Sequence, residues 1–455
     1  MASKQSKAGH AAKVDPLHAA RTQGAAAESA KSLTHSLPFT AKKTNVDDDD
    51  TMLDDVDVNG SSKVPHKKTI QPAEGVQQNG VPDGTPMMES DSNYHADEED
   101  GDELDDDVYV MHVSTNWDGT LAGSWWSDFG VRLYDLERGL TTAGTQVMLG
   151  HEDRVTGLSF GDSHNEPHAV FTCAEDGVAA MWDRRTGRME QKFRAPLAGA
   201  EPVPFLSIDV GAENSLLAAG TDEDEESRLL FWDRRAARPL GSYEDSHYEG
   251  ITQIRFNPMR KTELATAGLD GLVCYFDIRQ RTEEDALVSV LNAESPVSKI
   301  GFFGPSQECL YCLTHSETLH LFHAQKAVAM AEFPMIRERL AAQGMPSDFL
   351  IDCAYVEGPP GSRSQSLLLV SGDHTGTICL GDVTLAGVQK LCTVQSNLGH
   401  KKDVRSVAFL RPDPTSGVPA MILSGGEDGL VCEWTHAKTK RGPVRRGGAR
   451  RKSRR

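Results

Sequence analysis

The 455-residue sequence lacks any apolar run close to the roughly 18 residues that a membrane-spanning helix needs. Its N-terminus, MASKQSKAGHAAK, has no hydrophobic stretch of the kind found in secretory signal peptides. The eight cysteines mostly sit inside apolar runs, so we expect reduced thiols in an intracellular protein without a disulfide framework. The Ala/Ser/Lys-rich start of the chain is faintly similar to a transit peptide, but it contains a single arginine, Arg21. Mitochondrial import is therefore a minor alternative.

Catalytic signatures are also missing. The sequence contains no GxxxxGK[ST] phosphate loop, no GxSxG nucleophile elbow and no HExxH zinc motif. Cys309 and Cys312 form a CxxC, but residues three apart on a strand point to opposite faces, so we interpret them as packed thiols. His164 and His168 flank a proline in a predicted loop and have no cluster of further ligands. We expect no cofactor, no metal site and no enzyme, with a hydrolase kept as a third hypothesis.

Charge is distributed unevenly along the chain, whose formal net charge is -20. Residues 1–107 lack hydrophobic periodicity and contain two acid runs, from Asp47 to Asp57 and from Asp97 to Asp107. Such a segment cannot bury enough surface to offset chain entropy, so we predict a disordered acidic arm over residues 1–107. We expect the folded core to survive removal of residues 1–100. Residues 438–455 contain ten Lys and Arg and no acid, which predicts an exposed basic tail.

Short β-prone runs separated by turn residues fill the region between arm and tail, residues 108–437. A repeat recurs there at a spacing of about 45 to 55 residues, which is typical of four-stranded propeller blades. The third predicted strand of each repeat ends on an aromatic residue or its substitute, usually followed by Asp: Tyr134-Asp135, Trp182-Asp183, Trp232-Asp233, Phe276-Asp277, Phe322, Gly381-Asp382 and Trp434. Seven such endings predict an all-β fold, a seven-bladed WD40 β-propeller.

The most regular repeats carry a Gly-His pair before the first strand and an Asp in the tight turn before the third. LGHEDRVTGLSF (149–160) precedes FTCAEDGVAAMWD (171–183), and LGHKKDVRSVAF (398–409) precedes ILSGGEDGLVCEW (422–434). In WD repeats such side chains resemble a buried hydrogen-bonded network that holds a blade together. Since they recur once per blade, we assign a structural role and not a catalytic one to His151, Asp176, Trp182, His247, Asp270, His400, Asp428 and Trp434.

Two repeats depart from this pattern. Phe322 has no Asp after it, and Gly381 stands where the aromatic residue is expected. Between them, MIRERLAAQG (335–344) predicts a short helix inserted on the propeller, because Pro334 precedes it and Gly344 ends it. A propeller closes by sharing strands between its first and last blades. No convincing fourth strand follows Trp434, so we expect an N-terminal strand to close the ring, with residues 108–114 as the candidate.

Several segments are more particular than the repeats themselves. They are EEDALV (283–288), LLFWDRR (229–235), YCLTHSETL (311–319) and GGEDGLVCEW (425–434) before a basic tail. Through them the region from about residue 108 to 437 resembles the family of WD repeat-containing protein 89 and its plant relatives. The resemblance implies a non-catalytic intracellular scaffold with a link to ribosome biogenesis. The long acidic arm is not a feature of that family.

Three features predict binding to partners. Arg185, Arg235 and Arg279 each stand two residues after the Asp that follows the aromatic ending, a spacing that resembles the WDxR box of propellers that act as substrate receptors of cullin-RING ubiquitin ligases. Alternatively, these arginines only contact neighbouring loops. The loop TDEDEES (221–227) and the acid runs are suited to basic clients such as ribosomal proteins or histones, although acidic loops are often merely solvated.

The basic tail is typical of nuclear or nucleolar localisation signals and of non-specific RNA contacts through phosphates, since it has no interleaved aromatics. We expect a scaffold in a multiprotein complex of the nucleus or nucleolus, with the cytoplasm as an alternative location and no membrane association. The ligase receptor is the second hypothesis.

Overall fold

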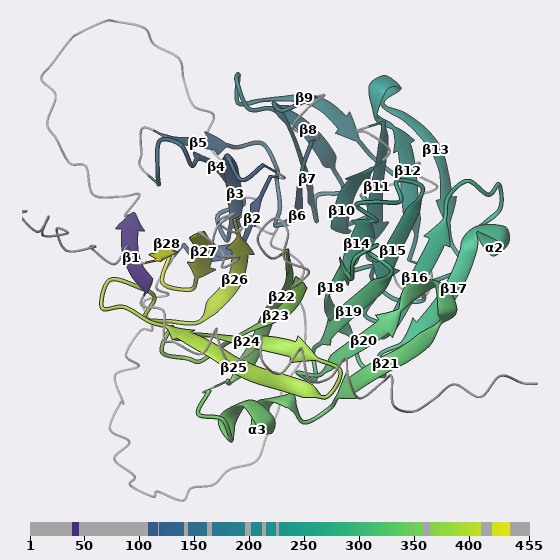
Figure 1. Ribbon diagram of the computed structural model, residues 1–455. Coiled ribbons are helices and arrows are strands. Elements are labelled where there is room, and N and C mark those ends of the chain that lie inside the picture. The colour runs from purple at the N-terminus through teal and green to yellow at the C-terminus, as the bar shows by residue number, and fades with distance from the viewer. Residues whose placement is uncertain are drawn as a thin grey trace, which may run out of the picture. The chain divides into compact units, whose positions relative to one another are not determined.

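The computed structural model describes residues 39–44 and 108–436, with gaps at 117, 141–143, 162–165, 196–201, 212–214, 224–226, 346, 358–364 and 411–420. Most of the predicted acidic arm and the predicted tail, residues 438–455, lie outside this range. The described chain forms seven four-stranded sheets arranged as blades around a ring (Figure 1). The predicted all-β, seven-bladed fold is confirmed.

Each of the first four blades is built from consecutive antiparallel strands, with the first strand innermost. Blade 1 contains β2 (Val110–Thr115), β3 (Leu121–Trp126), β4 (Val131–Asp135) and β5 (Thr145–Met148). Blade 2 contains β6 (Val155–Phe160), β7 (Ala169–Ala174), β8 (Ala179–Asp183) and β9 (Arg188–Phe193). Blade 3 contains β10 (Phe205–Gly211), β11 (Leu216–Thr221), β12 (Leu229–Asp233), the 3-10 turn η2 (Arg234–Ala236) and β13 (Arg238–Tyr243). Blade 4 contains β14 (Gln253–Phe256), β15 (Glu263–Ala267), β16 (Leu272–Asp277), the helix α2 (Glu283–Ala286) and β17 (Leu287–Asn292).

The remaining blades follow the same order, except that the last one is completed from elsewhere in the chain. Blade 5 contains β18 (Val297–Phe303), β19 (Cys309–Thr314), β20 (Leu319–His323), η3 (Ala324–Lys326) and β21 (Val328–Phe333), after which the helix α3 (Ile336–Ala341) follows. Blade 6 contains β22 (Phe349–Glu357), β23 (Gln365–Gly372), β24 (Ile378–Thr384) and β25 (Gly387–Val394). Blade 7 contains β26 (Val404–Phe409), β27 (Met421–Gly426), β28 (Val431–His436) and β1 (Phe39–Thr44).

Blade 7 is closed by a strand from the predicted acidic arm. β1 pairs antiparallel with β28, from Phe39 opposite His436 to Thr44 opposite Val431. The segment predicted to supply the closing strand, residues 108–114, instead forms most of β2, the innermost strand of blade 1. The expectation of an N-terminal closing strand holds, but its position was wrong, because β2 is needed to pair with β3. Residues 39–44 are likewise a strand within the segment predicted to be disordered.

Seven apolar clusters form the core, one between each pair of neighbouring blades. The cluster between blades 7 and 1 joins Val110 and Val113 of β2 to Leu423 of β27 and Val431 of β28, all nearly fully buried. Burying one such side chain contributes roughly 1.5–3 kcal/mol. The ring is thus closed by side-chain packing between its first and last blades as well as by the backbone pairing of β1.

The Gly-His signature has a steric cause. The ring of Trp434 lies against Gly399, where an added Cβ would approach the ring at 2.4 Å. The glycine of the tight turn before the third strand has a positive φ, as in Gly177 (71°) and Gly429 (66°). The two glycines of a regular blade therefore make room for the tryptophan and for the turn.

Strand alternation divides the connections between two faces of the ring. Within a blade the four strands run up and down in turn, so the connections after the first and third strands lie on one face. The connections after the second strand, and those between blades, lie on the opposite face. The arginines after the third strands and the Gly-His segments are consequently on opposite faces.

Candidate interaction surfaces

The predicted side chains of blade 2 form a continuous hydrogen-bonded chain. The Trp182 indole donates to Thr172 Oγ1 (2.8 Å), and Thr172 Oγ1 lies 2.7 Å from His151 Nε2. His151 Nδ1 lies 3.0 Å from Asp176 Oδ2. Because the hydroxyl accepts from the indole, it donates to Nε2, and a neutral imidazole then donates from Nδ1 to the carboxylate. The chain links the inside of the blade to the turn before its third strand.

The same geometry recurs in two other blades. In blade 7, His400 contacts Asp428 (2.9 Å) and Ser424 (2.7 Å), which accepts from the Trp434 indole (2.7 Å). In blade 4, His247 contacts Asp270 (3.0 Å) and Thr266 (2.8 Å), but Phe276 replaces the indole.

Sequence reasoning missed the connecting hydroxyl of each blade. Its signal was present, because the Ser or Thr stands four residues before the Asp every time: Thr172, Thr266 and Ser424.

The turn carboxylates are held in their ionised form. Burial by itself would raise the pKa of Asp176, but the His151 hydrogen bond and the backbone N–H groups of Glu152 and Val178 lower this pKa overall. Burial opposes the histidine and backbone contacts in the same way at Asp270 and Asp428, whose pKa values are also lowered. These groups stabilise the blade as acceptors, which fits their assignment as structural residues.

Blade 6 fills the site of its missing aromatic residue from outside its own sheet. A Cβ on Gly381 would lie 2.5 Å from Val388 and 3.5 Å from Met345, so neighbouring side chains occupy this space. Met345 follows α3, and it joins Ile336 and Leu340 of that helix in the buried cluster between blades 5 and 6. The inserted helix therefore supplies apolar volume that the degenerate repeat lacks.

The three candidate partner-binding arginines lie exposed on one face, and each pairs with the Asp two residues before it. Arg185 Nη2 lies 2.5 Å from Asp183, Arg279 Nη2 2.5 Å from Asp277, and Arg235 Nε 3.3 Å from Asp233. The Arg185 hydrogen bond lowers the pKa of Asp183 to about 2. We name this group of Arg185, Arg235 and Arg279 the Arg rim. Among the described residues, its guanidinium groups donate to the Asp of their own blade.

A hollow of about 290 Å³ lies beside the Arg rim, between blades 2 and 3. Its walls include Pro167, Met181 and Trp182, together with Arg185 and the buried Arg234. Arg234 donates to Glu166 Oε1 (2.6 Å), which ties the two blades together. His168, considered above as a loop histidine, also lines this hollow, and its Nδ1 is buried without a hydrogen-bond partner among the described residues. His164 lies outside the described residues.

The face opposite the Arg rim is rich in exposed carboxylates. We name it the acidic face, after the exposed side chains of Glu152, Asp153, Asp222, Glu249, Glu294 and Asp348. They stand in connections of blades 2 to 6.

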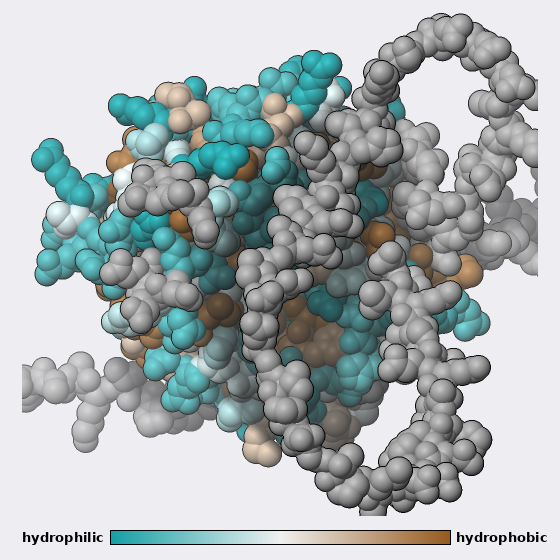
Figure 2. All heavy atoms as spheres, turned by 180° about the vertical axis from the view of Figure 1, so that it is seen from behind, coloured by the Kyte–Doolittle hydropathy of each residue, from teal (hydrophilic) through white to brown (hydrophobic). Residues whose placement is uncertain are grey.

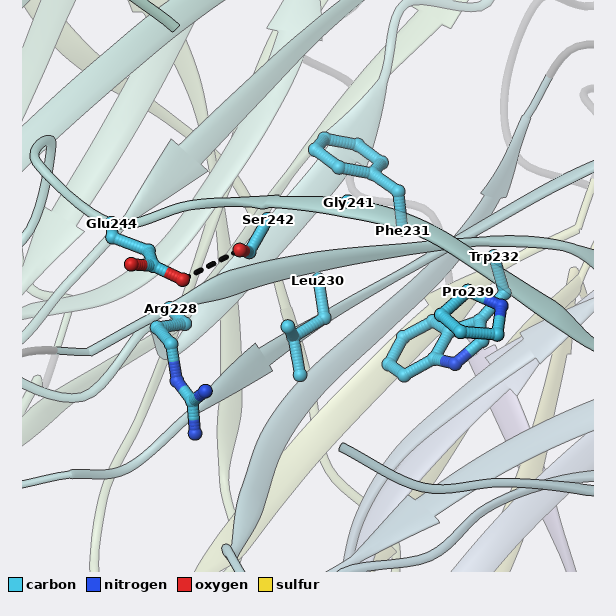
Figure 3. Close-up of a pocket in the computed structure, with 8 residues that line it drawn as sticks. All are labelled: Arg228, Leu230, Phe231, Trp232, Pro239, Gly241, Ser242 and Glu244. Atoms are coloured by element: carbon cyan, nitrogen blue, oxygen red, sulfur yellow. Dashed lines mark hydrogen bonds between the residues drawn. The ribbon is translucent and has the colours of Figure 1, made fainter. Parts of the chain in front are cut away.

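The acidic loop of blade 3 belongs to the acidic face, and Glu223 in this loop pairs with Arg228 at 2.7 Å. A smaller hollow of about 140 Å³ beside it runs along β12 and β13 (Figure 3). Arg228 and Glu244 lie at one end of this hollow, and Trp232 and Pro239 lie at the other. Figure 2 shows a mainly hydrophilic surface with scattered hydrophobic residues.

The CxxC cysteines lie on one strand, β19, and both are buried. Burial raises the pKa of Cys309 to about 11 and that of Cys312 to about 12, so neither thiol ionises at neutral pH. Within the described residues, no group of three or more His, Cys, Asp or Glu side chains is placed to hold a metal ion. No helix among those residues has the length and apolarity to cross a membrane.

Comparison with known proteins agrees with this geometry. A family model described as "WD domain, G-beta repeat" matches residues 144–183 and 391–435. WD repeat-containing protein GTS1 of Arabidopsis thaliana is 30% identical over 334 residues, which cover 72% of this chain and 81% of that protein. The WD repeat-containing protein 89 homolog of Dictyostelium discoideum is 27% identical over 334 residues, 73% of this chain and 84% of its own length. GATOR2 complex protein Wdr59 of Drosophila melanogaster is 28% identical over 145 residues, 31% of this chain and 14% of its own length. The chain therefore belongs to the WD repeat family that includes WD repeat-containing protein GTS1 and the WD repeat-containing protein 89 homolog.

Proposed function

We propose that this chain is a non-enzymatic scaffold that binds basic proteins on its acidic face, within a multiprotein complex of the nucleus or nucleolus. The observation that carries the proposal is the gathering of exposed carboxylates from blades 2 to 6 on one face. Such a face attracts and orients cationic partners before contact. WD repeat propellers bind other proteins, and the name of one relative, GATOR2 complex protein Wdr59, places that protein in a complex.

The clients that fit this chemistry are Lys- and Arg-rich proteins such as ribosomal proteins or histones. The resemblance to the WD repeat-containing protein 89 family favours ribosome assembly among these. The basic tail supports a nuclear location, since its ten cations are concentrated and free of acids. A fluorescent fusion that lacks residues 438–455 should spread through the cytoplasm. Unchanged nuclear accumulation would remove this argument for the location.

Co-purification from growing cells tests the acidic face. A variant with E152Q, E249Q and E294Q removes three exposed carboxylates from three connections and leaves the core unchanged. We expect it to melt like the wild type and to recover several-fold less basic protein. The matched control, R185A with R235A, alters the opposite face and should recover the wild-type amount. Equal recovery by both variants, or loss only in the control, would contradict the proposal.

A substrate receptor of a cullin-RING ligase is the second candidate, favoured by the exposure and constant spacing of the Arg rim. A partner on this face would compete with Asp183, Asp233 and Asp277 for the guanidinium groups. On this hypothesis R185A with R235A abolishes co-purification of a ligase adaptor at an unchanged melting temperature. Wild-type protein that never recovers an adaptor, even with abundant ligase subunits, would exclude it.

A further inference from the structure

The innermost strands of the blades surround the middle of the ring (Figure 1). Several of them carry polar and charged side chains. In six of these strands the pairing with the second strand shifts register near the start. Directly after the shift stand His112 in blade 1, Lys299 in blade 5, Asp352 in blade 6 and Ser406 in blade 7. In blade 3, Asp209 stands two residues after the residue that directly follows the shift. In blade 4, Arg255 stands at the position that matches Asp209. All except Ser406 keep part of their surface accessible to water.

One contact crosses the ring. Lys299 Nζ lies 3.4 Å from His112 Nδ1, although blades 5 and 1 are not neighbours. Ser406 Oγ lies 2.9 Å from the same nitrogen. Side chains from opposite sides therefore meet near the axis and form one cluster.

The charges of this cluster act on one another. Burial, followed by the charges of Lys299 and Arg255, lowers the pKa of His112 well below its usual range. Burial also lowers the pKa of Lys299. The charge of Asp352 opposes this shift, and the charge of Arg255 adds to it. Arg255 is thus close enough to influence both of the other basic groups.

The two carboxylates of the cluster are already engaged by donors. Asp209 accepts from the Ser159 hydroxyl (2.9 Å) and from the backbone N–H groups of Phe256 (2.8 Å) and Val210 (2.9 Å). Asp352 accepts from the Tyr311 hydroxyl (3.1 Å) and from its neighbour, the Cys353 N–H (2.7 Å).

The two cations are not engaged in this way. Arg255 donates to the Ile254 carbonyl (3.1 Å), and Lys299 contacts His112. Among the residues that the structure describes, neither has a carboxylate oxygen within ion-pair distance. Burial raises the pKa of Asp209 and of Asp352, and the charge of Arg255 opposes this rise at both, as the charge of Lys299 does at Asp352. A guanidinium has five N–H donors and an ammonium has three. Most donors of Arg255 and Lys299 therefore have no protein acceptor among the described residues.

Two further polar atoms of the same strands are buried without a hydrogen-bond partner among the described residues: Ser114 Oγ in β2 and Gln253 Oε1 in β14. Ser114 follows His112 by two residues, and Gln253 precedes Arg255 by two, so each shares a strand face with a member of the cluster. Buried polar groups are normally paired, and enclosed cations normally have a counter-ion.

We propose that the centre of the ring is a binding site for a compact oxyanion of the phosphate class, held by Arg255 and Lys299. The guanidinium fork matches two oxygens of such an ion, and the ammonium adds a second positive charge. The Ser114 hydroxyl lies in the same strand as His112 and supplies an uncharged donor. This site is independent of the acidic face and of the basic tail.

Calorimetric titration of the full-length protein with inorganic phosphate, at constant ionic strength set by sodium chloride, tests the site. We expect saturable binding at about one ion per chain and a melting temperature that rises with phosphate concentration. K299Q and R255Q should each raise the Kd at least tenfold. R281Q removes an exposed cation of blade 4 outside the cluster and should bind phosphate like the wild type.

The proposal would be overturned if K299Q and R255Q still bound phosphate like the wild type. It would also be overturned if R281Q lost binding as much as they do. The absence of saturable binding to the wild type would also overturn it and leave a channel filled by water. If R255Q fails to fold, K299Q decides alone. A phosphorylated peptide that binds the wild type tightly where free phosphate does not would contradict the free ion as ligand.

Discussion

Blades 2 and 7 differ from blade 6 in what fills the space beside the third strand. In blades 2 and 7 a buried indole, a hydroxyl, an imidazole and a carboxylate form one hydrogen-bonded chain. In blade 6 a glycine occupies the indole position, and Met345, which follows α3, and Val388 of β25 pack into the space. The comparison teaches that a repeat can lose its signature and keep its packing, provided that another segment supplies the volume.

The two solutions respond differently to damage. Loss of one member of a polar chain leaves a buried partner unsatisfied, which costs about 1–3 kcal/mol beyond the lost contact. Truncation of an apolar side chain that fills the space in blade 6 costs only transfer energy and cavity energy, in proportion to the atoms removed. The regular blades should therefore be the more sensitive to conservative changes, and the degenerate blade the more sensitive to loss of volume.

Trp182→Ala should have the largest effect. The side chain is almost fully buried, and its removal both empties a cavity and leaves the Thr172 hydroxyl without its donor. We expect a loss of about 3–5 kcal/mol in the free energy of unfolding, measured by chemical denaturation. Trp182→Phe imitates blade 4 and should cost about 1 kcal/mol. If W182A unfolds like the wild type and only loses partners, the residue is a binding residue and not a structural one.

Leu340→Ala tests the apolar packing that α3 contributes between blades 5 and 6. Leu340 is completely buried in α3, so we expect a loss of about 2–5 kcal/mol in the same measurement. Leu385→Ala, at an exposed turn of blade 6, should change stability by less than about 0.5 kcal/mol. A negligible effect of L340A would mean that α3 merely rests on the surface.

Removal of residues 1–100 should now destabilise the ring, contrary to the sequence-based expectation of no effect. It deletes β1 and exposes the edge of β28, and six paired residues at about 0.2–1 kcal/mol each amount to about 1–6 kcal/mol. Removal of residues 1–36 keeps β1 and should leave the melting temperature unchanged. Identical melts of both truncations would show that the ring closes through the packing of blades 7 and 1 alone.

The smallest effect concerns pH. The pKa of Asp176 is lowered in the folded state, so its stabilising contribution is present above the unfolded pKa of about 3.9 and is lost as pH falls through the folded value. The wild type should lose stability below about pH 4, and D176N should lose less over that window. L340A should keep the pH slope of the wild type. An unchanged slope in D176N would contradict the account of its carboxylate.

Sequence patterns located the blades because each regular repeat has a local cause. The indole needs a glycine beside it and a hydroxyl beneath it, and the turn needs Asp-Gly, so the residues recur at fixed spacing. The closing strand was not found, because FTAKKT has no apolar alternation and is separated from β2 by more than sixty residues. The central cluster was equally invisible, since its members are scattered over six of the seven blades and meet only when the ring closes. The helix α3 was predicted from its flanking proline and glycine, but its role in blade 6 depends on long-range packing.

The central claim is that basic clients bind the acidic face. Its most direct test is zero-length carbodiimide cross-linking of the full-length protein with the proteins that co-purify with it, because this reagent joins a carboxylate to a lysine that touches it. The account predicts that client lysines become joined to Glu152, Glu249 and Glu294. Cross-links confined to carboxylates in connections of the opposite face, such as Glu137, would contradict it.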